Sequence, residues 1–298
     1  YNKVSDFASL FCSQCSKTML EKEQCEFFES QGYVVLRSFL TEDNLTALRK
    51  RCQHYAPDPA LIRQYAQEDD KKRFEYSLSQ ALPAEILAKR KLENPDADEM
   101  NETGPFQLPV LSAVVKELCR ELVPAEAFCI VSEPGSRDQV PHTDSIPLEG
   151  QSDESWQASL HYIGLLVPLQ DTNERIGQTA VVPTSHLNPC LTEEIKVSMN
   201  LGDVLVLDGR TTHRGLANTQ QPDLDLVMDR MGDDGDVASA KTISVAAGTP
   251  LPRKLCFLTF TLPGVADGNA LAYAELEEES NEVPNNYKEI QKKKVKVI

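Results

Sequence analysis

The sequence predicts an α+β fold in which helices pack on an antiparallel β-sheet. Helical patterns fill the first half of the chain and strand patterns the second half, an order typical of α+β proteins. The strand patterns are short and are separated by turn signals such as Glu133-Pro134-Gly135 and Asp171-Thr172-Asn173, which favours a closed or sandwiched antiparallel fold. Because 41% of the 298 residues are hydrophobic, the chain can bury one large core. We expect a single domain over residues 1–298.

The first part of the chain, residues 1–125, is predicted to be rich in helix. Residues 17–31 have a helical pattern that ends at Gly32, a residue type that suits the left-handed position after a helix. The short β-type run Tyr33-Val34-Val35-Leu36 follows at once and predicts an early strand.

Two more helices are predicted in this part. Thr41 can cap a helix that has Glu42 and Asp43 in its first turn, where the helix dipole favours acidic groups. Apolar residues recur at helical spacing over residues 108–122, which predicts a third helix. Residues 56–104 are polar and interrupted by prolines, so we expect helices and loops there, without chemistry.

The β core is predicted over residues 126–262. Its strand-like runs are residues 127–132, 159–169, 177–182, 203–208 and 255–262. An insertion at residues 220–252 interrupts the core, and an acidic tail follows at residues 263–298. The insertion is equally consistent with a lid over a substrate and with a surface loop.

Charge and hydropathy exclude some partners. The formal net charge is −16, which argues against nucleic-acid binding because phosphate contacts need clustered Lys and Arg. No apolar stretch is long enough for a transmembrane helix. Most of the eight cysteines lie in apolar contexts, as in a reducing compartment. We therefore expect an intracellular, cytoplasmic location, although the chain begins at Tyr1 and a targeting signal cannot be assessed. Nothing in the sequence predicts the oligomeric state.

Three residues suggest a metal site. His142 and Asp144 are two residues apart, so on an extended segment both side chains point to the same side. His213 follows the strand-like run at 203–208. Two histidines and one carboxylate suit Fe(II), with positions left open for a cosubstrate and O₂. Taken alone, the three residues are equally consistent with ordinary loop and strand-end side chains.

The surrounding segments resemble, in order, those of the phytanoyl-CoA dioxygenase-like family of Fe(II)- and 2-oxoglutarate-dependent oxygenases. The matching segments are residues 28–40, 139–144, 177–186, 202–218 and 253–260. The resemblance implies a double-stranded β-helix (a jelly roll, cupin-like) core with N-terminal helices packed on the major sheet. Thr184 replaces a glycine of the family, which leaves the geometry of that turn open.

The resemblance also implies roles for individual residues. His142, Asp144 and His213 would bind iron. Arg253 would pair with the distal carboxylate of 2-oxoglutarate, which a guanidinium fork meets with two hydrogen bonds. Arg253 follows His213 at an unusually long distance in the sequence, so Arg230 in the insertion is a rival anchor. A strand-like run follows Arg253, which favours this residue.

Lower-ranked candidates complete the predicted site. Gln139 and Thr179 are candidates for contacts to the cosubstrate. Arg137, Arg210 and Tyr162 are candidates for contacts to the substrate.

The function implied is that of a dioxygenase that uses Fe(II), 2-oxoglutarate and O₂ and releases succinate and CO₂. It would oxidise a C–H bond of a small organic substrate, a secondary metabolite or an acyl or amino-acid-like compound, by hydroxylation, desaturation or oxidative cyclisation. The presence of Asp144 distinguishes the chain from related halogenases, which lack this carboxylate. Two alternatives remain open: a non-catalytic cupin-like metal-binding protein, and a metal-dependent oxygenase or isomerase that does not use 2-oxoglutarate.

Overall fold

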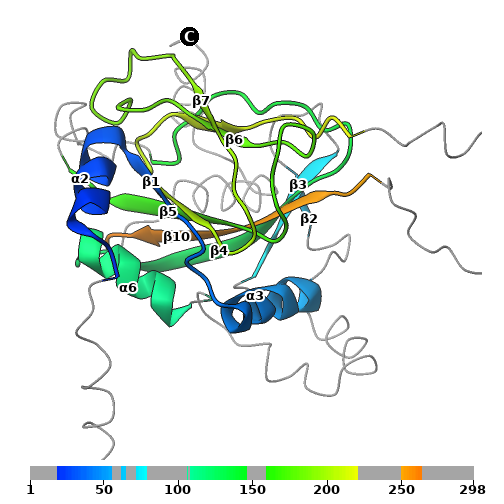
Figure 1. Ribbon diagram of the computed structural model, residues 1–298, viewed down its shortest axis with the longest axis horizontal. Coiled ribbons are helices and arrows are strands. Elements are labelled where there is room, and N and C mark those ends of the chain that lie inside the picture. The colour runs from blue at the N-terminus through cyan, green and yellow to red at the C-terminus, as the bar shows by residue number, and fades with distance from the viewer. Residues whose placement is uncertain are drawn as a thin grey trace, which may run out of the picture.

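Two antiparallel sheets and three helices make up the described part of the molecule, a mixed α/β arrangement (Figure 1). The computed structural model describes residues 19–55, 62–64, 72–78, 106, 108–145, 159–220 and 250–263. Most of the insertion predicted at residues 220–252, including Arg230, and all of the tail after residue 263 lie outside these residues.

The larger sheet has seven strands, and each pairs antiparallel with its neighbours. Their order across the sheet is β1 (Tyr33–Leu36), β8 (Val204–Asp208), β5 (Tyr162–Pro168), β10 (Arg253–Thr261), β4 (Val123–Ser132), β3 (Arg73–Ser77) and β2 (Ile62–Gln64). The smaller sheet has the order β7 (Ile195–Val197), β6 (Thr179–Val181) and β9 (His213–Gly215). Strands far apart in the sequence are therefore neighbours in space.

The helices are α2 (Lys22–Gln31), α3 (Glu42–His54) and α6 (Pro109–Leu118). Gly32 ends α2 in the left-handed conformation, and its N–H donates to the carbonyl oxygen of Phe28. The side chain of Thr41 accepts from the N–H of Asn44 and caps α3, since the first turn of a helix lacks internal acceptors. Both predicted caps are confirmed.

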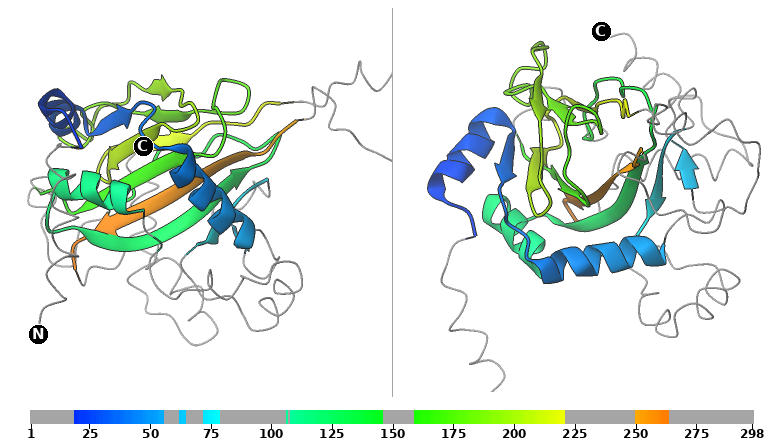
Figure 2. Two further views of the ribbon diagram at one scale, coloured as in Figure 1. Left: turned by 60° about the horizontal axis from the view of Figure 1, so that its bottom comes forward. Right: turned by 45° about the vertical axis from the view of Figure 1, so that its right-hand side comes forward.

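Helices α3 and α6 lie against one face of the large sheet, and the small sheet lies against the other (Figure 2). Side chains alternate along β10: Cys256 and Leu258 belong to the core that includes helix residues, whereas Leu255 and Phe257 belong to the core between the sheets. We call these the outer face and the inner face. A strand with both faces covered must be apolar on both sides unless a buried site needs polar groups.

The sequence prediction for residues 56–104 was wrong in part. Residues 62–64 and 73–77 are the strands β2 and β3, which extend the large sheet beyond β4. Arg73 and Glu75 alternate with apolar residues on β3 and are buried. Because buried positions on this strand carry charged residues, the hydrophobic pattern of a buried strand is absent from the sequence.

The turn at Thr184 keeps a left-handed backbone without glycine. Thr184 has φ +65°, a conformation that is unusual for a β-branched residue. Its N–H donates to the carbonyl oxygen of Gln31, and its own carbonyl oxygen accepts from Leu187 and Asn188. These hydrogen bonds hold the turn in the conformation that glycine would adopt more easily.

Candidate metal centre

The two histidines of the predicted triad lie directly opposite each other. His213 is the first residue of β9, and His142 pairs with it in an isolated antiparallel bridge. The N–H of each donates to the carbonyl oxygen of the other, at 3.0 and 2.9 Å. An antiparallel pair with both hydrogen bonds holds its two α-carbons roughly 5.5 Å apart. The backbone therefore brings together two residues that are far apart in the sequence.

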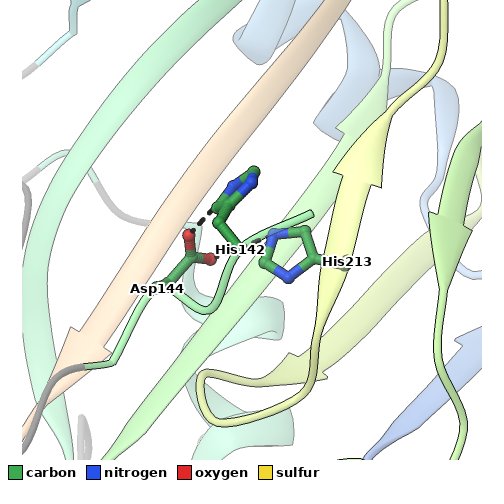
Figure 3. A group of neighbouring side chains, drawn as sticks. All are labelled: His142, Asp144 and His213. Carbon is green, nitrogen blue, oxygen red and sulfur yellow. Dashed lines mark ion pairs between the residues drawn. The ribbon is translucent and has the colours of Figure 1, made fainter. Parts of the chain in front are cut away.

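The three side chains converge on one point (Figure 3). His142 Nε2 lies 3.7 Å from Asp144 Oδ1, and His213 Nε2 lies 3.4 Å from Asp144 Oδ2. One ligand atom from each residue lies within 4.8 Å of the others. The predicted geometry of the HxD pair is confirmed, because His142 and Asp144 point to the same side.

Hydrogen bonds at the far side of each ring orient the histidines. His142 Nδ1 lies 2.9 Å from the carbonyl oxygen of Val140, and His213 Nδ1 lies 3.0 Å from that of Thr211. A carbonyl oxygen only accepts, so each Nδ1 carries the proton and each Nε2 presents its lone pair to the centre. This is the arrangement in which imidazole binds a metal.

The carboxylate of Asp144 also fits a metal. Within the described residues, Asp144 Oδ2 is buried and has no hydrogen-bond partner. A buried carboxylate oxygen is costly unless it meets a positive charge. Two neutral imidazoles and one carboxylate on one side of an ion match the facial triad of non-haem Fe(II) enzymes. The residues present therefore fit Fe(II).

The centre is more open on one side than on the other. The side chain of His142 is 33% exposed, whereas those of His213 and Asp144 are 7% and 6% exposed. On the buried side, Gly164 of β5 lies close to both Phe257 and Asp144. A methyl group on Gly164 would lie 2.6 Å from the ring of Phe257 and 3.7 Å from Asp144 Oδ2. Asp144 and Phe257 thus lie on the buried side of the centre, and the partly exposed side chain of His142 lies on the other.

The side chain of Arg253 lies on the inner face of the large sheet, near the predicted metal ligands. It is 1% exposed, and it donates to the carbonyl oxygen of Gln178 at 2.9 Å and to Ser132 Oγ at 3.1 Å. A methyl group built on Gly215 would lie 2.8 Å from Arg253 Nη2 and 2.6 Å from Gln139 Oε1. Glycine at this position is therefore what lets the guanidinium group approach β9.

The other two cosubstrate candidates also adjoin Gly215. Gln139 Oε1 accepts from the N–H of Gly215 at 2.8 Å. Thr179 on β6 is 2% exposed and pairs directly with Gly215, so the two residues share a face of the small sheet. The structure brings Gln139, Thr179 and Arg253 to one place, and their roles stay predictions.

The long sequence separation between His213 and Arg253 does not separate them in space. The N–H of Leu251 donates to Gln220 Oε1 at 2.6 Å, so the two ends of the insertion meet. Asn218 Nδ2 donates to the carbonyl oxygens of Ser132 and Leu251 at 3.0 and 2.9 Å. The chain therefore leaves β9 of the small sheet and enters β10 of the large sheet with the two ends of the insertion side by side.

The three substrate candidates differ in their surroundings. Arg210 is buried and is held by both carboxylate oxygens of Asp208. Tyr162 is buried with its ring against Gly209, and Arg137 is exposed. A substrate role for each of the three stays a prediction.

A hydrogen-bonded pair beside the metal ligands was missed in the sequence. Ser145 Oγ lies 2.5 Å from His161 Nε2, and His161 Nδ1 lies 2.8 Å from the carbonyl oxygen of Ser159. Because a carbonyl oxygen only accepts, Nδ1 of His161 carries the proton and Nε2 accepts the hydroxyl proton of Ser145. Burial lowers the pKa of the His161 ring. The pair fixes the chain just after Asp144. No spacing signal in the sequence pointed to this contact.

Two histidines and one carboxylate lie together between the two sheets. This set of ligands is typical of the non-haem iron oxygenases. The model of the phytanoyl-CoA dioxygenase (PhyH) family matches residues 28–222, and the chain belongs to this family of Fe(II)- and 2-oxoglutarate-dependent dioxygenases. A search of curated proteins gave no match.

Solved structures share the fold. The non-haem α-ketoglutarate-dependent carbocyclase SnoK from nogalamycin biosynthesis is 18% identical, with a TM-score of 0.52, over 82% of this chain and 86% of that one. HygX from Streptomyces hygroscopicus, with nickel and 2-oxoglutarate bound, is 15% identical, with a TM-score of 0.51, over 83% of this chain and 89% of that one. At these identities the likeness shows the fold. No helix in the described residues is long and apolar enough to cross a membrane.

Proposed function

We propose that His142, Asp144 and His213 bind Fe(II) and that Arg253 binds the distal carboxylate of 2-oxoglutarate. The observation that carries this assignment is the convergence of three ligand atoms within 4.8 Å, with both Nδ1 protons directed to backbone carbonyl oxygens. We further propose that the two sheets are the walls of a double-stranded β-helix. Residues 1–298 would then form one oxygenase domain.

The residues of the chain have separate tasks in this assignment. When bound, Fe(II) with 2-oxoglutarate and O₂ supplies the oxidation of a C–H bond, with release of succinate and CO₂. Asp144 contributes negative charge to the cation and the two imidazoles stay neutral donors. Arg253 fixes the far end of the cosubstrate. Phe257 and Gly164 bound the site with apolar surface, which excludes water from the reacting atoms.

The substrate is proposed to be a small organic molecule. A structure of HygX, 16% identical over 83% of this chain and with a TM-score of 0.52, contains hygromycin B, and SnoK is named a carbocyclase of nogalamycin biosynthesis. The exposed side of His142 gives such a molecule a route to the centre. Arg210, Tyr162 and Arg137 remain candidates for its contacts, and hydroxylation, desaturation and cyclisation are all compatible with this site.

The alternative is a metal enzyme or metal-binding protein without 2-oxoglutarate. Arg253 argues against it. A guanidinium group that is 1% exposed is costly to bury, and a site without an anionic cosubstrate has no need of it. Its position next to Gly215, two residues beyond a metal ligand, instead suits a dicarboxylate.

The assignment is tested by anaerobic titration of the protein with Fe(II) and then 2-oxoglutarate. A keto acid that chelates Fe(II) gives a weak visible charge-transfer band, and we expect this band with saturation at one equivalent. Absence of the band would refute the assignment. A screen of metabolites for succinate release, with mass spectrometry of the products, then identifies the substrate.

A further inference from the structure

The short segment that carries Asp144 is anchored on both sides of this residue. Before it, the backbone of His142 forms two hydrogen bonds with the backbone of His213. After it, the N–H of Ser145 donates to the carbonyl oxygen of Gly209 at 3.0 Å. Asp144 is therefore held between two attachments to one neighbouring segment, the segment that leads to His213.

The side chain of Ser145 adds a third attachment, to a different segment. Ser145 Oγ lies 2.5 Å from Nε2 of His161, which directly precedes β5, and each of the two residues is 4% exposed. The neutral His161 ring accepts the hydroxyl proton at Nε2, while its Nδ1 faces the carbonyl oxygen of Ser159 at 2.8 Å. A buried hydrogen bond between side chains is protected from competition by water. It ties the residue after Asp144 to the start of β5.

The carboxylate of Asp144 depends on this support for its direction. Oδ2 lies 3.4 Å from His213 Nε2 and, among the residues that the structure describes, has no hydrogen-bond partner. The backbone on either side of Asp144 must therefore direct this oxygen atom. A metal site binds tightly when its ligand atoms are held to within about 0.5 Å of the required positions. A carboxylate that the metal itself has to order binds more weakly.

We propose that His161 is a positioning residue, which holds the carboxylate of Asp144 in the direction that suits a metal ion through its hydrogen bond with Ser145. This inference rests on the proposed function, which assigns Asp144 to Fe(II). His161 does not touch the metal in this arrangement. Its loss leaves all three ligands in the chain and weakens metal binding, as loss of a group that orients a ligand does at other metal sites.

A serine next to a histidine also suggests a nucleophile and its base, and the geometry argues against that role. In such pairs a carboxylate usually orients the second nitrogen of the histidine, whereas Nδ1 of His161 faces a backbone carbonyl oxygen. Ser145 is only 4% exposed, so its hydroxyl group has little access to a substrate. The pair suits a fixed support better than a reacting group.

The test is a double-mutant cycle in the affinity for Mn(II), measured by calorimetric titration of the metal-free protein. We expect Ser145→Ala and His161→Phe each to raise the Kd for Mn(II) by about 10- to 100-fold, the usual effect of removing a group that orients a metal ligand. The double variant should bind no more weakly than the weaker single variant, because either change alone removes the same hydrogen bond. Effects that simply add would overturn the proposal.

His161→Gln separates the hydrogen bond from the packing of the ring. A glutamine side chain can place its Oε1 near the position of Nε2 and accept the hydroxyl proton of Ser145, whereas His161→Phe keeps a ring without an acceptor. We therefore expect His161→Gln to restore most of the affinity for Mn(II). If it binds Mn(II) no better than His161→Phe does, the hydrogen bond is not what positions Asp144.

His54→Phe is the matched control. His54 is 5% exposed and ends α3, the helix that packs on the outer face of the large sheet. The same substitution there should lower the free energy of unfolding and leave the Kd for Mn(II) unchanged. Equal weakening of Mn(II) binding in His54→Phe and His161→Phe would mean a general loss of stability and would refute the positioning role. If His161→Phe does not fold, Ser145→Ala alone must still raise the Kd.

Failure of the proposed function gives a different result from failure of this inference. If the wild-type protein binds no Mn(II), or if His213→Ala binds it as tightly as wild type, the triad is not the metal centre and both proposals fail. If wild type binds Mn(II) through the triad, and Ser145→Ala and His161→Phe bind it equally well, only the positioning role is wrong.

Discussion

The two faces of the large sheet carry different chemistry at adjacent positions of the same strands. On β3, Tyr76 belongs to the outer core, whereas Arg73 is buried on the inner face. On β10, Cys256 and Leu258 face the helices, while Arg253 faces the small sheet. Because side chains alternate with a period of two, a strand such as β10 carries core residues on its outer face and Arg253, a proposed cosubstrate ligand, on its inner face.

The outer face contains thiols that behave as apolar groups. Cys52 of α3 lies 3.2 Å from Cys256 of β10, sulfur to sulfur. A hydrogen bond with Cys52 and burial raise the pKa of the Cys129 thiol well above its usual value. A thiol that stays protonated is a poor nucleophile. The outer face therefore packs as a core, whereas the inner face carries the residues that we propose bind the metal and the cosubstrate.

The largest expected effect is that of His213→Ala on the inner face. Removal of one of three ligands should weaken Fe(II) binding by at least about 100-fold and abolish the charge-transfer band with 2-oxoglutarate. The free energy of unfolding of the metal-free protein should change little. Metal analysis measures the bound Fe(II), and denaturant unfolding measures the free energy of unfolding. His186→Ala is the control, since His186 is buried outside the triad and bonded to the carbonyl oxygen of Glu29; loss of iron in both variants would contradict the assignment.

Arg253→Gln should have the next largest effect. The variant loses a charged, two-point contact, so the Kd for 2-oxoglutarate should rise about 100-fold. Affinity for Fe(II) alone should not change. Calorimetric titration of the Mn(II)-loaded protein measures the Kd for 2-oxoglutarate. A wild-type Kd would show that Arg253 does not bind 2-oxoglutarate, and Arg230 would then be the remaining candidate.

Leu258→Ala tests the outer face. Leu258 is 1% exposed and packs in the helix-side core, so the truncation should cost about 2–5 kcal/mol of unfolding free energy. The Kd for 2-oxoglutarate should stay within about twofold, measured at a temperature where the variant is folded. A large change in Kd with little change in stability would break the proposed division between the faces.

The same division explains which parts of the molecule could be predicted from the sequence. The strand at Tyr33–Leu36 and the cap at Thr41 were predicted correctly because local pattern and capping chemistry agree with the fold. The HxD pair and the distal histidine also gave the correct cluster. Strand β3 was missed because two charged residues, Arg73 and Glu75, occupy buried positions and hide the apolar pattern of the strand.

The contacts between the two sheets could not be predicted from the sequence either. Gly215 meets Arg73 and Arg253 only because β9 lies against strands that are far from it in sequence. Neither spacing nor composition records such a contact. The hydrogen bond between Gln220 and Leu251, which closes the insertion, likewise appears only in the folded chain.

Tyr76→Phe has the smallest expected effect and tests the outer face of β3, the strand whose inner face carries Arg73 and Glu75. Tyr76 donates its hydroxyl proton to the carbonyl oxygen of Cys52 at 3.1 Å, and loss of this bond should cost about 1 kcal/mol of stability near neutral pH. Binding of 2-oxoglutarate should not change.

The cost of Tyr76→Phe should disappear at alkaline pH. Burial raises the pKa of Tyr76 far above its ordinary value of 10.0. A folded-state pKa above the unfolded one means that stability is fully present below about pH 10 and falls as the unfolded phenol ionises. Only wild-type protein has this loss, so the difference between the two proteins should shrink above about pH 10 and then reverse. Denaturant unfolding from pH 8 to pH 11 measures it, and a constant difference would mean that Tyr76 is not buried on the outer face.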